Sequence, residues 1–207
     1  VYLDPQNYID YMIVNIWGGN WDWPNKNFWF GRKRTSDSTG FKFYCWDAED
    51  VMLTSRSPLN MDKISSPDSG EVGRPHSLLR NNAEYRLLFA DRLHRLFFNE
   101  GILTSDPLIE RYTAMAGAIE QAIIPEAARW ADQNGSNATP ANWTSMRNRI
   151  LTSYLPQRTA IVLAQFRTAG LYPAIEAPGF YINSIHQHGG HILPTDSLTM
   201  QPAGTIY

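Results

Sequence analysis

Three oxygen-bearing side chains near the start of the chain have a spacing that suits phosphoryl transfer. Asp22 is followed five residues later by Asn27, and Asp47 comes after a predicted β-hairpin. Protein kinases use a catalytic Asp, a metal-binding Asn and a second metal-binding Asp in this order. Asp22 is therefore the candidate base for an acceptor hydroxyl, and Asn27 and Asp47 are candidate ligands of Mg²⁺ or Mn²⁺ beside ATP. Because Asp and Asn are also common loop residues, spacing alone leaves a purely structural interpretation open.

A helix and a hairpin are predicted to hold these residues. Asp4 can cap a helix whose apolar positions recur at helical spacing, and Gly18-Gly19 ends that helix. Strands are predicted over residues 27–33 and 41–46, joined by a turn over residues 36–40. A loop fixed by a helix before it and a strand after it can hold a catalytic side chain in a defined place.

Alternation along the second strand sorts its side chains onto two faces. Phe41, Phe43, Cys45 and Asp47 share one face, because successive side chains of a strand point to opposite sides. If Asp47 faces a nucleotide, Phe41 is the candidate for contact with the adenine. Phe43 and Cys45 are equally well explained as core residues.

The rest of the chain is predicted to be a long loop, a set of helices and a short β-rich end. Residues 47–75, rich in Ser, Pro, Asp and Gly, read as irregular loop. Pro125 is expected to kink or break the third helix that follows. The predicted helices span residues 76–82, 83–99, 105–132, 140–154 and 156–170.

Composition also predicts where the domains divide. After the last helix, Pro and Gly become frequent and helical periodicity ends. We therefore predict a mainly helical domain over residues 1–172, a linker over 173–178 and the truncated start of a β-rich domain over 179–207. Strands are predicted in the last part over residues 179–185 and 196–207.

Charge and hydropathy exclude two kinds of contact. The chain has 18 Lys and Arg against 20 Asp and Glu, a formal net charge of −2, so no nucleic-acid surface is predicted. No apolar stretch reaches the ~18 residues of a membrane span. The chain begins without an initiator Met or a signal-like segment, and we expect it to be an internal piece of a longer protein.

Several runs of residues resemble the spore-coat CotH kinase family, and together they cover residues 1–172. The most specific are the loop around Asp22 and the pair Trp46-Asp47. The resembling runs are Asn7 to Tyr11, Gly19 to Pro24, Lys26 to Trp29, Phe41 to Glu49, Leu78 to Phe98, Tyr154 to Arg158 and Leu163 to Pro173.

The resemblance implies an α+β fold, with a mainly helical protein-kinase-like C-lobe and a β-hairpin at the active site. It implies transfer of the γ-phosphate of ATP to Ser or Thr of secreted, cell-surface or spore-coat proteins, with Mg²⁺ or Mn²⁺. By position, Asp22 matches the catalytic aspartate, and Asn27 and Asp47 match the metal-binding residues. Phe41 stands where the family often has a Trp near the adenine.

The resembling runs correspond to the C-lobe, so the N-lobe with its nucleotide-binding Lys would precede Val1. We therefore expect the isolated chain to be inactive or nearly so. Residues 178–207 resemble the opening of an immunoglobulin-like, chitobiase-type β-domain of secreted carbohydrate-active enzymes, with the likeness in Pro202 to Tyr207. We therefore expect a fragment of a β-sandwich at this end of the chain, and we expect the protein to be bacterial and extracellular.

Other interpretations stay open. A pseudokinase or surface-binding module would keep the fold without the reaction. A carbohydrate site is suggested by the aromatic faces of several tryptophans, but such an enzyme needs paired carboxylates, and none is evident. His186, His188 and His191 have spacing that permits a transition metal, with an interdomain loop as the alternative. The tryptophans are Trp17, Trp21, Trp23, Trp29 and Trp46.

Overall fold

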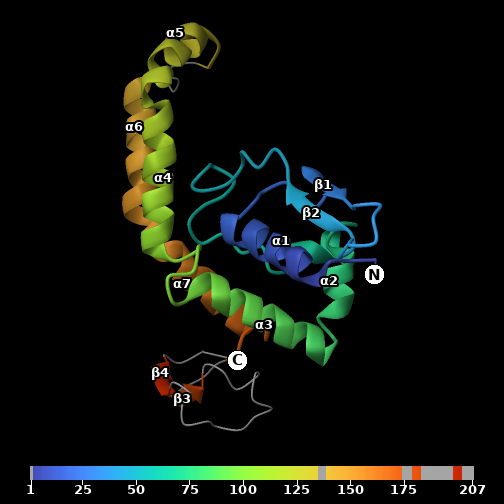
Figure 1. The fold of residues 1–207 in the computed structure, drawn as a ribbon. Helices are drawn as coiled ribbons and strands as arrows, with labels where there is room; N and C mark the ends of the chain where they lie inside the picture. Colours follow the sequence, from blue (N-terminus) through green and yellow to red (C-terminus); the bar gives the residue numbers. More distant parts are fainter. Residues whose placement is uncertain (1, 135–138, 174–178, 183–197, 202–207) are drawn as a thin grey trace.

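The computed structural model describes residues 2–134, 139–173, 179–182 and 198–201, and these are mostly helical (Figure 1). Helices η1 and η2 are 3₁₀ and η4 is a π-helix. In chain order the elements are α1 (Pro5–Gly18), β1 (Phe28–Gly31), β2 (Lys42–Cys45), η1 (Ser66–Ser69), α2 (Arg74–Leu79), α3 (Ala83–Phe97), α4 (Ser105–Ile119), η2 (Glu120–Ala122), α5 (Ile123–Asn134), α6 (Pro140–Arg149), η4 (Ile150–Tyr154), α7 (Leu155–Thr168), β3 (Gly179–Ile182) and β4 (Leu198–Gln201).

Helix α1 begins and ends where its sequence predicts. The Asp4 carboxylate accepts a hydrogen bond of 3.0 Å from the Asn7 backbone N–H, which satisfies one of the free amides of the first turn. At the other end Gly19 adopts φ 64°, the left-handed conformation that glycine tolerates best, and its N–H donates back to the Ile16 carbonyl at 3.1 Å. The predicted cap and stop are both confirmed.

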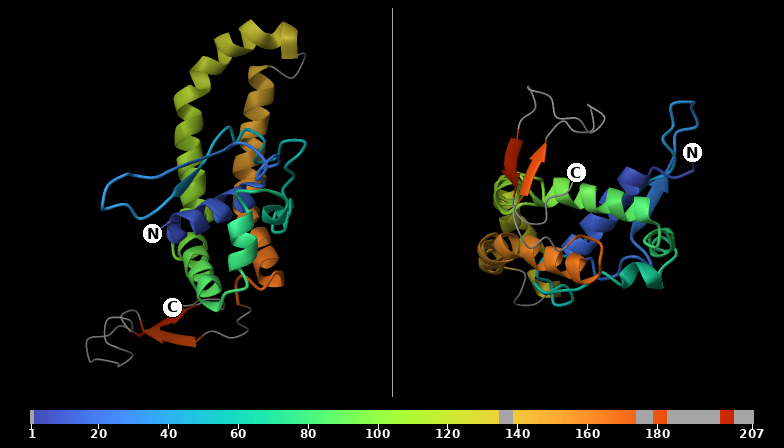
Figure 2. Two further views of the ribbon diagram at one scale, coloured as in Figure 1. Left: turned by 90° about the vertical axis from the view of Figure 1, so that its right-hand side faces the viewer. Right: turned by 90° about the horizontal axis from the view of Figure 1, so that it is seen from below.

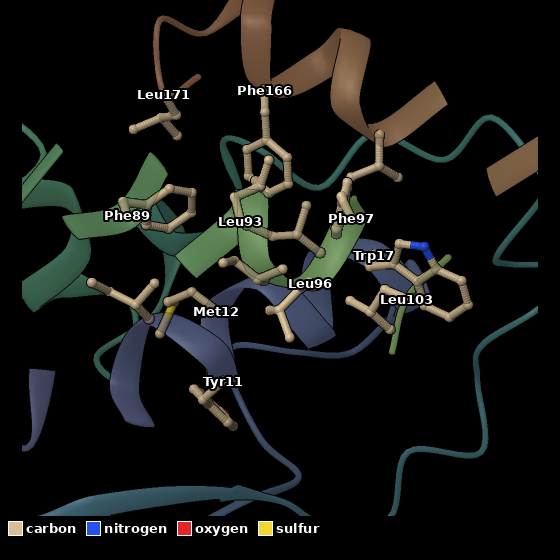
Figure 3. Packing of buried hydrophobic residues seen from close by; sticks show 14 of the residues in the cluster. Tyr11, Met12, Trp17, Phe89, Leu93, Leu96, Phe97, Leu103, Phe166 and Leu171 are labelled. Carbon is tan, nitrogen blue, oxygen red and sulfur yellow. The ribbon is translucent and has the colours of Figure 1, made fainter. Parts of the chain in front are cut away.

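The core lies where α1, α3 and α7 meet, as Figure 3 shows. Met12 and Leu93, from α1 and α3, are fully buried. Phe89 of α3 and Phe166 of α7 pack edge to face, with ring centroids 5.5 Å apart. This packing fixes α1 in the interior, so the chain that leaves its C-terminus starts from a rigid point.

The predicted hairpin is confirmed and packs against α1. Strands β1 and β2 are antiparallel, with Phe28 opposite Cys45. The Phe43 ring lies with its centroid 5.0 Å from that of Tyr8 and 5.6 Å from that of Tyr11, both on α1. The face that carries Phe43 therefore covers the helix, as core residues would.

The third predicted helix is broken, as expected, but ahead of the proline. Helix α4 ends at Ile119, the chain passes through η2, and α5 starts at Ile123 with Pro125 in its first turn. A proline is tolerated there because first-turn amides have no helical partner. Both α4 and α6 extend from the core to α5, which lies at the far end (Figures 1 and 2).

The helices predicted over residues 140–154 and 156–170 are found, as α6 with η4 and as α7, but no break separates them. Helix α6 continues into α7 through the π-helix η4, in which the Leu155 N–H donates to the Ile150 carbonyl. Pro156 follows this widened turn. Proline inside an α-helix clashes with the carbonyl four residues earlier, and a π turn moves that carbonyl away.

The C-terminal strands β3 and β4 form one antiparallel pair, with Gly179 opposite Gln201, inside the two predicted strand segments. Within the described residues, no second sheet packs on this pair, so the expected β-sandwich is not seen. Residues 183–197 and 202–207, including the three histidines at 186, 188 and 191, lie outside the described residues. Of the helices that are described, none has the length and apolarity to cross a membrane.

Candidate active site

The loop that carries Asp22 is fastened to α1 on both sides of this residue. Asn20 is buried, and its side-chain amide donates to the Asn15 side-chain oxygen at 2.9 Å. Trp23 is buried too, and its indole N–H donates to the Tyr11 hydroxyl at 2.8 Å. Since Asn15 and Tyr11 belong to the rigid helix, the backbone at Asp22 is held in a defined place.

The backbone just before Asp22 is also bonded to the long loop. The Trp21 N–H donates to the Asp50 carbonyl at 3.1 Å, and the Trp21 carbonyl accepts from Lys63 Nζ at 2.9 Å. Both backbone polar groups of Trp21 are thus satisfied by residues far along the chain. The loop over residues 47–75 therefore forms part of the frame of the site.

The structure brings Asp22, Asn27 and Asp47 together. The Asn27 side-chain amide donates to Asp22 Oδ2 at 2.7 Å and to the Asp47 backbone carbonyl at 3.2 Å. The Trp46 N–H donates to the Asn27 carbonyl at 3.3 Å, next to the end of the hairpin. Asn27 therefore links the candidate base with the second candidate metal ligand.

Asn27 and Asp47 both have left-handed backbones, with φ of 59° and 47°. Asn and Asp adopt this region more readily than other residues with side chains, yet it is sparsely populated. The left-handed turn takes Asp47 out of the strand geometry. The predicted alternation from Phe41 to Asp47 is therefore wrong at its last member, because period two holds only while the backbone stays extended.

The two carboxylate oxygens of Asp22 have different surroundings. Oδ2 accepts from Asn27 and lies 3.2 Å from the ammonium of Lys26, whose side chain is 68% exposed. Oδ1 is buried and, within the part of the chain that the structure describes, has no hydrogen-bond partner. Buried polar atoms are nearly always satisfied, so an open one at this position needs an explanation. Oδ1 is therefore the carboxylate oxygen of Asp22 that has acceptor capacity left.

The donors present fit a divalent metal that is held mainly by a nucleotide. Asn27 uses its amide nitrogen in the two hydrogen bonds above, which leaves its carbonyl oxygen for a ligand. Asp47 is exposed and has a carboxylate. Mg²⁺ takes hard oxygen ligands and commonly has only one or two from the protein, with phosphates and water as the rest. Among the described residues, no group of three or more His, Cys, Asp and Glu side chains forms a metal cluster.

Phe41 lies apart from these three residues, just before β2, whereas Asp47 follows the other end of that strand. Its ring packs edge to face on Phe30, with centroids 5.9 Å apart, and the Arg32 guanidinium lies 6.0 Å from its centroid. The ring is 37% exposed. Contact between Phe41 and an adenine stays a prediction.

Arg158 is a structural support of the end of α1 that sequence reasoning did not single out. It is fully buried on α7 and donates to three backbone carbonyls: Ile16 at 3.0 Å, Trp17 at 2.7 Å and Leu59 at 2.7 Å. Two of these, Ile16 and Trp17, are in the last turn of α1, where carbonyls lack the usual donor four residues ahead, and Ile16 accepts from Gly19 N–H as well. Burial lowers the pKa of the Arg158 guanidinium.

The sequence contains a signal that could have found Arg158. Leu155, Val162 and Phe166 are buried at helical spacing, and Arg158 lies on the same face of α7. An arginine inside an apolar stripe needs internal acceptors. A hollow of about 690 Å³ between α5 and α6 is lined by other residues and is separate from the site.

Comparison with known proteins gives one result for this chain. The family model described as CotH kinase protein matches residues 1–162 of the 207, well over half. The match includes α1, the hairpin and all three candidate site residues, and it ends within α7. No curated protein and no solved structure matches.

Proposed function

This chain belongs to the CotH kinase family, and we propose that it forms the kinase-like C-lobe of an atypical protein kinase. The proposed reaction is ATP- and metal-dependent transfer of the γ-phosphate to Ser or Thr of secreted, cell-surface or spore-coat proteins. The observation that supports it best is the link made by Asn27, which joins the Asp22 carboxylate to Asp47 at 2.7 and 3.2 Å.

Asp22 acts as the base in this proposal. The acceptor hydroxyl oxygen forms a bond to the γ-phosphorus while the bond to the β–γ bridging oxygen breaks, and the hydroxyl proton passes to the Asp22 carboxylate. Oδ1 is the oxygen for this transfer, because Oδ2 is already held by Asn27 and Lys26. Asn27 and Asp47 would hold the metal, which when bound neutralises charge on the phosphates.

Backbone strain next to the site supports the same proposal. Met52 and Leu53, in the loop after Asp47, both have positive φ, at 53° and 71°. Bulky apolar residues rarely adopt this conformation, which persists only where the surroundings enforce it and is found preferentially at functional sites. The Leu53 N–H donates to the Ser57 carbonyl at 2.9 Å, which helps to hold this turn.

The test is the variant Asp22→Asn in the full-length protein that contains this chain. It keeps the shape of the side chain and removes the base, so phosphate transfer should fall by roughly 10²- to 10⁴-fold while ATP binding is retained. Asp37→Asn is the matched control, because Asp37 lies in the exposed turn of the hairpin and contacts Lys33 and Thr35. Equal transfer by Asp22→Asn and wild type would remove Asp22 from the mechanism.

A role in binding alone is the alternative, and the same assay separates it from catalysis. A pseudokinase would bind nucleotide and show no transfer in the wild type. The exposed aromatic residues Trp29 and Tyr44, paired across the hairpin, would then be candidates for the contact with a partner.

A further inference from the structure

Lys63 is a buried cation that the reaction described above does not use. It is 8% exposed, although it lies in the long loop between the hairpin and α2. Lysine is almost never buried without compensation, because its ammonium loses water that the protein must replace. In its place the Trp21 carbonyl accepts from Nζ at 2.9 Å, and Nζ also lies 6.0 Å from the centroid of the Trp21 ring. This carbonyl belongs to the residue directly before Asp22.

The segment around Lys63 is fastened to α7. Arg158 donates to the Leu59 carbonyl at 2.7 Å, and Gln165 donates to the carbonyls of Asn60 and Met61 at 3.3 and 3.4 Å. On the other side, Ile64 belongs to the hydrophobic core. Helix α7 thus fixes this part of the loop.

Lys63 also lies close enough to the Asp22 carboxylate for the charges to attract. Burial lowers the pKa of the Lys63 ammonium, and attraction to Asp22 acts in the opposite direction. Two cations therefore act on Asp22 in different settings: Lys26 forms an ion pair with it at 3.2 Å, and Lys63 is bonded to the carbonyl of the residue before it. Lys26 is mostly exposed, so water and salt screen its charge, whereas Lys63 is held inside the protein.

We propose that Lys63 is a positioning residue for the phosphoryl transfer: it fixes the Trp21 carbonyl and keeps a positive charge beside the Asp22 carboxylate. This inference rests on the proposed function. A charge that is already in place does not have to be organised during the reaction, and the base keeps its alignment with the acceptor hydroxyl. Loss of this support should therefore affect turnover more than nucleotide binding.

The experiment compares Lys63→Met and Lys63→Arg with wild type in the full-length protein. Lys33→Met is the matched control, since Lys33 is an exposed lysine that pairs with Asp37 in the hairpin turn. We expect Lys63→Met to lower kcat at least about tenfold with little change in KM for ATP, and Lys63→Arg to restore much of the loss. Hydrogen exchange of the amides of residues 20–27 should be faster in Lys63→Met and unchanged in Lys33→Met.

The outcomes separate this inference from the proposed function. An inactive wild type would contradict the kinase, and hydrogen exchange alone would then decide whether Lys63 holds the loop. An active enzyme in which Lys63→Met leaves kcat and exchange unchanged would overturn the role of Lys63 only. Equal loss in Lys63→Met and Lys63→Arg would also overturn it. Should Lys63→Met fail to fold, Lys63→Gln keeps an N–H donor without the charge, and full kcat in that variant would show that the charge is not needed.

Discussion

Gly19 lies directly against Ser57, so that a Cβ built on Gly19 would come within 2.6 Å of the Ser57 Oγ. The Ser57 hydroxyl in turn donates to the Gly18 carbonyl at 3.3 Å, and Ser57 is fully buried. The end of α1 and the long loop therefore meet without room for a side chain. The residue that follows, Asn20, is the first anchor of the Asp22 loop.

This contact predicts opposite results for two adjacent glycines. Gly19→Ala should destabilise the fold by about 2 kcal/mol, because alanine is strained at φ 64° and its Cβ would displace Ser57. Gly18→Ala is the control: it is helical, and its Cβ would touch Val51 at an ordinary 3.5 Å. Chemical denaturation should show Gly18→Ala to be neutral or more stable by up to about 1 kcal/mol. Equal effects of the two substitutions would contradict the geometry.

Arg158→Met should be among the most destabilising substitutions in the chain. Methionine fills similar space, but the Leu59 carbonyl would lose its donor inside the protein. The carbonyls of Ile16 and Trp17 would lose a charged donor and keep only the Gly19 N–H and the Tyr154 hydroxyl. We expect a loss of about 3 kcal/mol in the free energy of unfolding. Arg56→Met, which removes an exposed pair with Asp50, should cost less than about 1 kcal/mol. Similar midpoints for both variants in urea would show that Arg158 does not stabilise this junction.

Asp47→Asn should change the metal requirement of phosphate transfer while leaving the fold intact. Its carboxylate is exposed, and the contact with Asn27 uses the Asp47 backbone carbonyl, which the substitution retains. Loss of one negative ligand should raise the Mg²⁺ concentration for half-maximal transfer at least about tenfold. Titration of Mg²⁺ against the full-length protein measures this. An unchanged Mg²⁺ dependence would mean that Asp47 is no ligand.

Local signals were enough to predict the elements that carry the site. The cap at Asp4 and the stop at Gly19 are chemistry of single residues, and the hairpin follows from aromatic runs on either side of a turn. The order of Asp22, Asn27 and Asp47 then predicted a grouping that the structure shows. Such features depend on neighbours in the sequence, and their positions can be derived from it.

The supports of the site could not be predicted in the same way. Lys63 and Arg158 act on backbone carbonyls 42 and 141 residues away along the chain, and no periodicity specifies such pairs. The helices predicted to end at residue 154 and to begin at residue 156 are joined by a π turn directly before Pro156. Asp47 left the strand alternation because its own backbone turns left-handed. In each case a tertiary contact or a local distortion decided the outcome.

His76 predicts how the stability of the protein depends on pH. Its imidazole is fully buried, Nδ1 pairs with the Tyr85 hydroxyl at 2.8 Å, and Nε2 has no partner within the described residues. Burial, together with the nearby Arg80, lowers the pKa of His76 from 6.5 to about 4, with Asp68 acting in the opposite direction. The folded protein therefore keeps this imidazole neutral under conditions in which the unfolded chain is protonated.

The sign of the effect follows from proton binding. Above pH 6.5 both states are neutral at His76, and between pH 6.5 and 4 only the unfolded state takes up the proton, so stability falls as the pH falls. By pH 4 the free energy of unfolding that is lost through His76 is at most about 3 kcal/mol. His76→Phe keeps an aromatic ring and removes the titration, so its unfolding free energy should decline less than that of wild type across this window. Parallel decline of the two proteins in urea titrations from pH 7 to 4 would show that His76 is not the group responsible.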